Sequence, residues 1–281
     1  MNIEPAVRGT TAGKAVRRNA DRVGRPLLYD LPELRGAHDA LWTALRERAP
    51  ALRTAPARLS RDTDGDWGEV VFGQVSGYRY ATQLVDHVTL IATPRYKAKG
   101  ADGPFVRSAI LVRAKDPVGG LVDLRGRSLA LQAGDLNSIN LLRAEAAQLA
   151  LGGRFFGPVH PHDTLDGVAE AVLEGRTDAA LLDCVALALL GRLRPDLTRG
   201  LRVLLWTTRS PGPPIIAGLS LKPSAVEAVR QALNDIAADA SLEQVRNDLL
   251  IAGFNLLPKA QYRAITHLEQ IAESQDYPRL A

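Results

Sequence analysis

Short apolar runs alternate with amphipathic stretches through most of the chain. Runs such as 88–93 and 179–182 have the length and the Val, Ile and Leu content of buried strands. In 164–174, by contrast, Val168 and Val172 recur at helical spacing, so that they lie on one side of a helix. This alternation of strands and helices predicts an α/β fold.

The most regular units lie in the second half of the chain. Strands separated by single helices pair in parallel through right-handed crossovers, so this part is expected to form a compact lobe. Its expected elements are strands at 128–131, 155–160, 179–182 and 201–206 and helices at 138–151, 164–174 and 184–193. Elsewhere, strands are expected at 27–29, 69–74, 88–93, 105–113 and 215–221, and helices around 34–45, after a capping box at 224–227, at 242–251 and at 258–273.

Two breaker segments divide the chain. One holds Asp116-Pro117 and Gly119-Gly120, and the other is the run SPGPP at 210–214. We therefore expect two lobes, the second inserted into the first. Residues 27–113 plus 211–281 form the expected lobe 1, residues 114–210 form lobe 2, and residues 1–26 form a tail.

The net charge of +4 is concentrated in that tail, because residues 1–26 hold six basic and two acidic residues while the rest of the chain holds 29 of each. The segment is rich in Gly, Ala, Arg and Thr and lacks apolar periodicity, which is typical of disorder. It fits a nucleic-acid arm or a passive leader, and the neutral body favours the passive interpretation. No nucleic acid is expected as a partner.

Other classes of protein are excluded by what the sequence lacks. No run approaches the roughly 18 apolar residues of a membrane span, and residues 1–26 contain no apolar core of the kind that a secretory signal needs. Cys184, the single cysteine, allows no intrachain disulfide, and its apolar setting indicates a buried thiol. His160 and His162 have no third ligand nearby, which is weak evidence for a metal. No membrane insertion, metal or cofactor is expected.

A polar turn at 134–138 (GDLNS) stands between an expected strand and an expected helix. The first N–H groups of a helix have no partner within the helix and lie at the positive end of its dipole, so such a turn is suited to an anion. The same residues also describe an ordinary N-cap, in which Asn137 or Ser138 satisfies the helix start. The turn alone leaves both interpretations open.

Four motifs, taken in order, resemble type II periplasmic binding proteins, and in particular the phosphate, phosphite and phosphonate branch of the ABC-transporter substrate-binding proteins. They are 73–78 (GQVSGY), similar to the ligand-facing tyrosine loop of that branch, 123–127 (DLRGR), the turn at 135–138 (DLNS), and 175–183 (GRTDAALLD). The resemblance covers residues 27–281. It implies a two-lobed Venus-flytrap α/β fold with mixed sheets, a small ligand in the cleft between the lobes, and an ABC permease as a partner.

The resemblance also implies which residues face the ligand. Tyr29 is expected to end the first strand on the cleft, and the second lobe contributes positions that contact a phosphonate or an amino group in some members. The expected ligand-binding residues are Tyr29, Ser76, Tyr78, Asn137, Ser138, His162 and Asp183. Where the family shows two or three Ser or Thr residues at the helix start, this chain has Asn137 and Ser138. The ligand is therefore expected to be a small anion or a zwitterion.

Alternatives remain for these residues and for the function. Asp183 is also suited to cap the helix that begins at Cys184, His162 to a surface loop, and Tyr78 to packing. Some relatives of the fold, the chorismate dehydratase and the thiamine pyrimidine synthases, are enzymes. If this chain were such an enzyme, Asp183, His162 or Tyr78 would act in proton transfer. The chain has no Gly-x-Ser-x-Gly, no phosphate-loop and no His-Glu-x-x-His motif. The expectation is a solute-binding protein without catalysis. Its location is periplasmic by resemblance, with the cytoplasm left open because this chain shows no signal.

Overall fold

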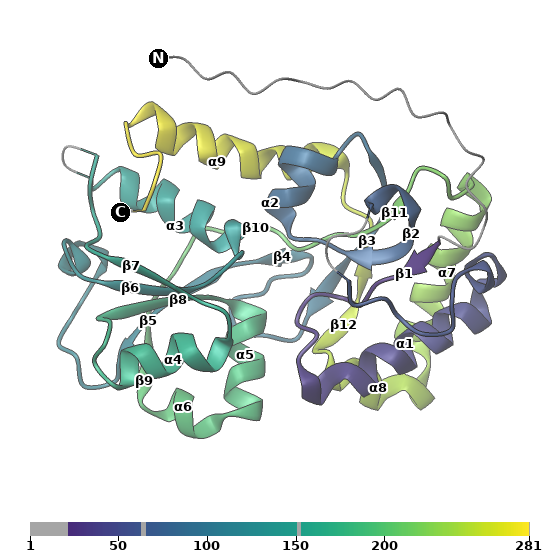
Figure 1. Cartoon of the computed structure of the whole chain (residues 1–281), viewed down its shortest axis with the longest axis horizontal. Coiled ribbons are helices and arrows are strands. Elements are labelled where there is room, and N and C mark those ends of the chain that lie inside the picture. The colour runs from purple at the N-terminus through teal and green to yellow at the C-terminus, as the bar shows by residue number, and fades with distance from the viewer. Residues whose placement is uncertain (1–21, 63–65, 151–152, 281) are drawn as a thin grey trace, which may run out of the picture.

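The computed structural model describes residues 22–62, 66–150 and 153–280. Most of the basic segment at 1–26 lies outside the described residues. The described chain forms two α/β lobes side by side, joined by several strands and by one long C-terminal helix (Figure 1). The expected two-lobed α/β fold with mixed sheets is confirmed.

The first lobe is built on a five-stranded sheet with the order β1-β2-β11-β3-β12. Its strands are β1 (Val23–Gly24), β2 (Val70–Gln74), β3 (Val88–Tyr96), β11 (Ile215–Gly218) and β12 (Ile251–Asn255). Helices α1 (Arg35–Arg48), α7 (Pro223–Ala238) and α8 (Glu243–Asp248) cover it. Trp42 of α1 stacks on Phe72 of β2 with their ring centroids 5.9 Å apart, and both side chains are fully buried. This packing fixes α1 on the sheet.

The strand expected at 27–29 is not formed. The parallel pairing of β1 with β2 occurs earlier, at Val23 and Gly24, because Pro26 lacks an N–H group and cannot extend the ladder. Tyr29 then has a φ of 66°, a left-handed value that turns the chain away from the sheet. The segment is therefore a loop on the cleft side of the lobe, and the turn redirects the Tyr29 side chain.

The second lobe is built on a sheet with the order β7-β6-β8-β5-β9, in which β6 is parallel to β7 and β8 while β5 is antiparallel to β8 and β9. Its strands are β5 (Ser108–Arg113), β6 (Leu129–Gln132), β7 (Val159–His162), β8 (Ala179–Asp183) and β9 (Leu201–Trp206). Its helices are α3 (Leu136–Ala147), α4 (Leu165–Leu173), α5 (Cys184–Leu193) and α6 (Pro195–Arg199). The expected all-parallel pairing is thus interrupted by one antiparallel strand.

That strand, β5, also moves the boundary between the lobes. The expected lobe 1 includes residues up to 113, yet β5 pairs with β8 and β9 of the second lobe. The physical reason is burial on both faces: Ile110 and Val112 face the core under α3, and Ala109 and Leu111 face the core under α4.

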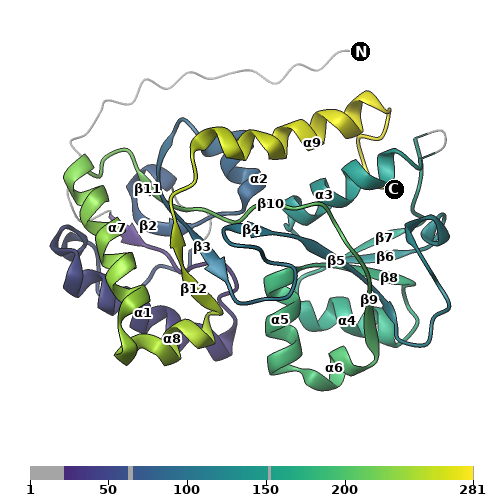
Figure 2. The same ribbon diagram turned by 180° about the vertical axis from the view of Figure 1, so that it is seen from behind.

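The C-terminal helix α9 (Arg263–Ser274) differs from the expected boundary as well. It begins beside the short helix α2 (Gly77–Arg79) of the first lobe and lies along α3 of the second (Figure 2). Tyr277 and Leu280, which follow it, are buried in the core of the second lobe. A two-stranded ribbon of β4 (Phe105–Val106) and β10 (Ser210–Pro211) completes the junction.

Helix starts also depart from expectation at α7. The capping box expected at 224–227 is not formed, because α7 begins one residue earlier, at Pro223, with Lys222 as a cap that makes no side-chain hydrogen bond. Proline at the first helical position already has the required φ and lacks the N–H group that a cap would satisfy.

Gly100 offers a test of the packing between the lobes. Its φ is +99°, and a Cβ atom there would stand 2.4 Å from the Trp206 ring and 2.9 Å from Cys184. Gly100→Ala is expected to lower the free energy of unfolding by roughly 2–4 kcal/mol, because it adds overpacking to backbone strain. Gly103→Ala is the control, since Gly103 has a φ of +56° but open space around it. It is expected to cost about 1 kcal/mol in urea denaturation, and equal losses for the two variants would contradict the packing argument.

Candidate ligand-binding site

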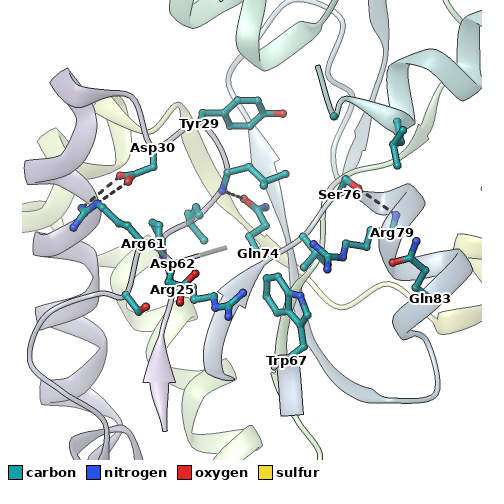
Figure 3. A pocket seen from close by; sticks show the side chains of 17 residues that line it. Arg25, Tyr29, Asp30, Arg61, Asp62, Trp67, Gln74, Ser76, Arg79 and Gln83 are labelled. Atoms are coloured by element: carbon teal, nitrogen blue, oxygen red, sulfur yellow. Dashed lines mark hydrogen bonds and ion pairs between the residues drawn. The ribbon is translucent and has the colours of Figure 1, made fainter. Parts of the chain in front are cut away.

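A cavity of about 570 Å³ opens between the first lobe and the start of α3 (Figure 3). Most of its wall comes from the first lobe: the loop after β1, Trp67, and the passage from the end of β2 into α2. Gly134 and Leu136 close it from the second lobe. Concave sites of this size that are largely apolar with a few polar groups are typical of ligand pockets.

Arginine side chains and one tryptophan dominate the polar part of the wall. The Arg25 and Arg79 guanidinium carbons lie 4.4 Å and 5.5 Å from the centroid of the Trp67 ring. Such cation–π contacts hold each guanidinium in place near the cavity. Arg61 is already neutralised by Asp30, at 2.6 Å, and by Asp39, at 3.1 Å. Arg79 makes no ion pair with any residue that the structure describes.

A hydrogen bond joins the lobes at the base of the cleft. The Tyr29 hydroxyl donates to Asp183 Oδ1 at 2.9 Å, across 154 residues of sequence. The Tyr29 ring packs edge-on against Tyr96, with centroids 6.2 Å apart. Burial, and secondarily the Asp183 carboxyl, raises the pKa of Tyr29 well above its usual value, so the phenol stays protonated as the donor.

Two helix starts of the second lobe carry buried carboxyl groups. Asp183 caps α5 by accepting from Val185 N at 2.8 Å and Ala186 N at 3.0 Å. Asp135 caps α3 by accepting from Ser138 N at 3.1 Å. Burial and then the charge of Asp135 raise the pKa of Asp183 to about 7, and burial also raises the pKa of Asp135. Neither Asn137 nor Ser138 is the cap of α3, because Asp135 occupies that position and its charge complements the helix dipole.

The structure gives both Asn137 and Ser138 internal partners. Asn137 donates from Nδ2 to Ser210 Oγ at 3.1 Å, while its Oδ1 is buried without a partner among the described residues. Ser138 is buried, and its Oγ accepts from Ser108 Oγ at 2.7 Å. Their hydrogen bonds therefore attach the first turn of α3 to β10 and β5.

The remaining expected residues divide into two groups. Ser76 lines the cavity, and its Oγ accepts from Arg79 N at 3.2 Å, which fixes the start of α2. Tyr78 instead points to α9, where its hydroxyl donates to Glu269. His162 ends β7 and is absent from the cavity wall. The structure thus brings Tyr29, Ser76 and, through Tyr29, Asp183 to the cavity.

Sequence reasoning missed the arginine and tryptophan cluster. The sequence analysis assigns Arg25 to the basic tail at 1–26, but in the structure its side chain is 5% exposed and lines the cavity. Arg79 follows the tyrosine loop that the sequence does single out. Trp67 stands in a short 3-10 turn, Trp67–Glu69, just before β2. The alternation of apolar and polar residues gives no signal for such a cluster, because its members meet only in the folded lobe.

Other kinds of site find no support in the described part of the chain. It contains no group of three or more His, Cys, Asp or Glu residues placed to hold a metal ion. Within the same ranges, no helix has both the length and the apolar character needed to cross a bilayer. Cys184 is buried as expected, and burial raises the pKa of its thiol to about 12, so the thiol stays protonated at neutral pH.

Two α/β lobes with a cavity between them define a binding protein of the periplasmic type. The sequence matches the family described as "ABC transporter, phosphonate, periplasmic substrate-binding protein" over residues 68–262. The chain therefore belongs to this family, whose members are substrate-binding components of transporters rather than enzymes. No individual curated protein sequence matches the chain significantly.

Solved structures share the fold at low sequence identity. A binding protein component of an ABC phosphonate transporter from Pseudomonas aeruginosa has a TM-score of 0.72 at 15% identity, over 90% of this chain and 87% of that one. PhnD1 from Prochlorococcus marinus, in complex with methylphosphonate, has a TM-score of 0.71 at 11% identity, over 89% and 97%. XAC2383 from Xanthomonas citri, bound to ATP, has a TM-score of 0.68 at 15% identity, over 91% and 98%.

The raised pKa of Asp183 predicts a pH-dependent stability. The folded protein keeps a proton on Asp183 up to a pKa of about 7, whereas the unfolded chain releases it near pH 4. The contribution of Asp183 to the free energy of unfolding should therefore be highest below about pH 4, fall as the pH rises to about 7, and level off above it. Asp183→Asn should flatten this slope in urea denaturation, whereas Asp196→Asn, at an exposed position on α6, should leave it in place. A slope unchanged in Asp183→Asn would contradict the assignment.

Proposed function

We propose that the protein binds a small anionic or zwitterionic solute in the cavity between its lobes and presents the loaded, closed form to an ABC permease. The cavity carries this proposal, because it combines unneutralised positive charge, hydroxyl groups and apolar walls at the junction of two lobes. Membership of the family supports the transport role.

Closure of the lobes around a ligand is supported by two contacts between the lobes. The Tyr29 to Asp183 hydrogen bond is one. Another is the ion pair between Glu33 of the first lobe and Arg194 of the second, at 2.6 Å. Both groups of the ion pair are more than a third exposed, so this contact adds little stability and can break at low cost. Because these closing contacts are weak, binding of the ligand can shift the equilibrium between the open and closed forms.

Ligands of similar structures are consistent with an anion. The Prochlorococcus protein is in complex with methylphosphonate, and the Xanthomonas protein is bound to ATP. These compounds share a phosphorus oxyanion and differ greatly in size. In this chain, Tyr29 and Ser76 are proposed to contact the ligand from the first lobe, and Asp183 to position Tyr29.

Calorimetric titration tests the class of ligand. At least one of phosphate, phosphite, methylphosphonate and aminoethylphosphonate is expected to give saturable heat with a Kd near 1 μM, equivalent to about −8 kcal/mol. At a hundredfold excess over Kd, such a ligand should also stabilise the fold by about 2.7 kcal/mol, visible as a rise in Tm. If none of the four gives heat or a shift in Tm with a folded sample, an oxyanion ligand of this kind is ruled out.

Tyr29→Phe tests closure. Loss of the hydroxyl removes the hydrogen bond to Asp183, which is worth about 1 kcal/mol, so the affinity for the ligand should fall roughly five- to tenfold. Tyr277→Phe is a matched control, because it removes a buried hydroxyl that bonds Leu280 O away from the cavity. The control should lower Tm without changing Kd. Equal Kd values for Tyr29→Phe and the natural protein would argue against Tyr29 as a closing contact.

A further inference from the structure

The volume of the cavity exceeds the needs of a simple oxyanion. At about 30 Å³ for each water, a space of about 570 Å³ holds roughly nineteen waters. Methylphosphonate has only five non-hydrogen atoms, so it would leave most of the space to solvent. Pockets of 300–1,000 Å³ are the size that buries ligands of drug or nucleotide dimensions.

The start of α3 is poorly suited to receive the anionic group. Two of its first three N–H groups already have protein acceptors: Leu136 N donates to Gly134 O at 2.9 Å, and Ser138 N donates to Asp135 Oδ1. The Asp135 carboxyl is itself an anion at this position, and it lies near enough to Asp183 to raise the pKa of that group. A second anion at the same helix start would meet repulsion from the Asp135 carboxyl.

Free donors lie instead on the first lobe. Arg79 and Gln83 are four residues apart on the helical segment that begins at α2, so they share one face. Among the described residues, neither side chain has an ion pair or a hydrogen bond, and the Arg79 guanidinium lies over the Trp67 ring. Figure 3 shows Arg79 extending from α2 toward Trp67. The Trp67 indole N–H is also buried without a hydrogen-bond partner in this part of the structure.

The rest of the wall is apolar. Leu27 and Leu28 from the loop after β1, Val75 after β2, and Leu136 from α3 line the same cavity. Leu136 is 42% exposed although it is a large apolar residue, and it lies where the second lobe closes the space. An apolar side chain left uncovered at this point gains burial if the ligand carries an apolar group.

We propose that the cavity takes an organic phosphate or phosphonate with a bulky, ring-bearing substituent, whose anionic head binds Arg79 and Gln83 on the first lobe while the substituent lies between Leu27, Leu28 and Leu136. This inference rests on the proposed function and names its ligand class. The Asp135 carboxyl, which caps α3, disfavours a simple oxyanion at that helix start.

Two probes that differ in one substituent test the size of the ligand. Phenylphosphonate and methylphosphonate carry the same head, so their dissociation constants, measured by calorimetry on the full chain, isolate the contribution of the ring. Phenylphosphonate is expected to bind at least tenfold more tightly, and adenosine monophosphate at least as tightly as phenylphosphonate. Equal affinities for phenylphosphonate and methylphosphonate would overturn the proposal of a bulky substituent while leaving the proposed function intact. Failure of every anion to bind a folded sample would overturn both.

Charge variants locate the anionic head. Arg79→Gln is expected to weaken phenylphosphonate binding at least tenfold, and Arg176→Gln, at an exposed arginine that pairs with Glu174 and does not line the cavity, is expected to leave it unchanged. Asp135→Asn keeps the size of the cap and removes its charge, and it is expected to change the affinity less than threefold. A tenfold gain in Asp135→Asn together with no loss in Arg79→Gln would place the head at α3 and refute the assignment to Arg79. Thermal unfolding of each variant confirms that it is folded.

Discussion

The Asp183 carboxyl group accepts hydrogen bonds from both lobes, and the geometry of the cleft depends on it. Two of its bonds come from the N–H groups that open α5, and the third comes from Tyr29 of the first lobe. Tyr29 reaches it only because the loop after β1 turns through a left-handed residue. A buried polar group of this kind is costly unless it is fully bonded, so opening of the lobes exposes Asp183 to water instead of leaving it unpaired.

That arrangement divides the charges of the cleft between the lobes. On the second lobe, Asp135 caps α3 and Asp183 caps α5. On the first lobe, the guanidinium groups of Arg25 and Arg79 both make cation–π contacts with the Trp67 ring. Since a helix dipole can be compensated by a protein carboxyl as well as by a ligand, the second lobe no longer depends on a bound anion at α3. The arginine side chains of the cavity wall all lie on the first lobe.

Periodicity was sufficient to predict much of the fold. The expected helix 184–193 and strand 201–206 match α5 and β9, because each forms a continuous apolar stretch between clear breakers. It was insufficient for β5, because its apolar run does not show that it pairs with β8 and β9, which follow much later in the chain. The strand expected at 27–29 fails for a local reason, since neither Pro26 nor the left-handed Tyr29 can continue the ladder.

The site was less predictable than the fold, because its side-chain contacts join segments that are far apart in the sequence. Asp183 and Ser76 lie at element ends, where a strand gives way to a helix, and such positions are visible in the sequence. Tyr78 lies in α2, two residues after Ser76, yet its hydroxyl is bonded to Glu269, because α9 returns from the far end of the chain to cover α2. When a helix from the far end of the chain covers a residue, the sequence around that residue carries no pattern that shows the contact.

The returning helix also decides how the lobes can move. α9 contacts α2 of the first lobe and α3 of the second, and the residues after it are buried in the second core (Figure 2). Asn140 of α3 adds a buried hydrogen bond to Ile265 O. This side of the junction is therefore held by apolar packing, whereas the opposite side has the exposed pair of Glu33 and Arg194. Because packed surfaces resist separation more than exposed ion pairs do, opening should occur as a hinge about the α9 side, widening the cavity at the Tyr29 loop.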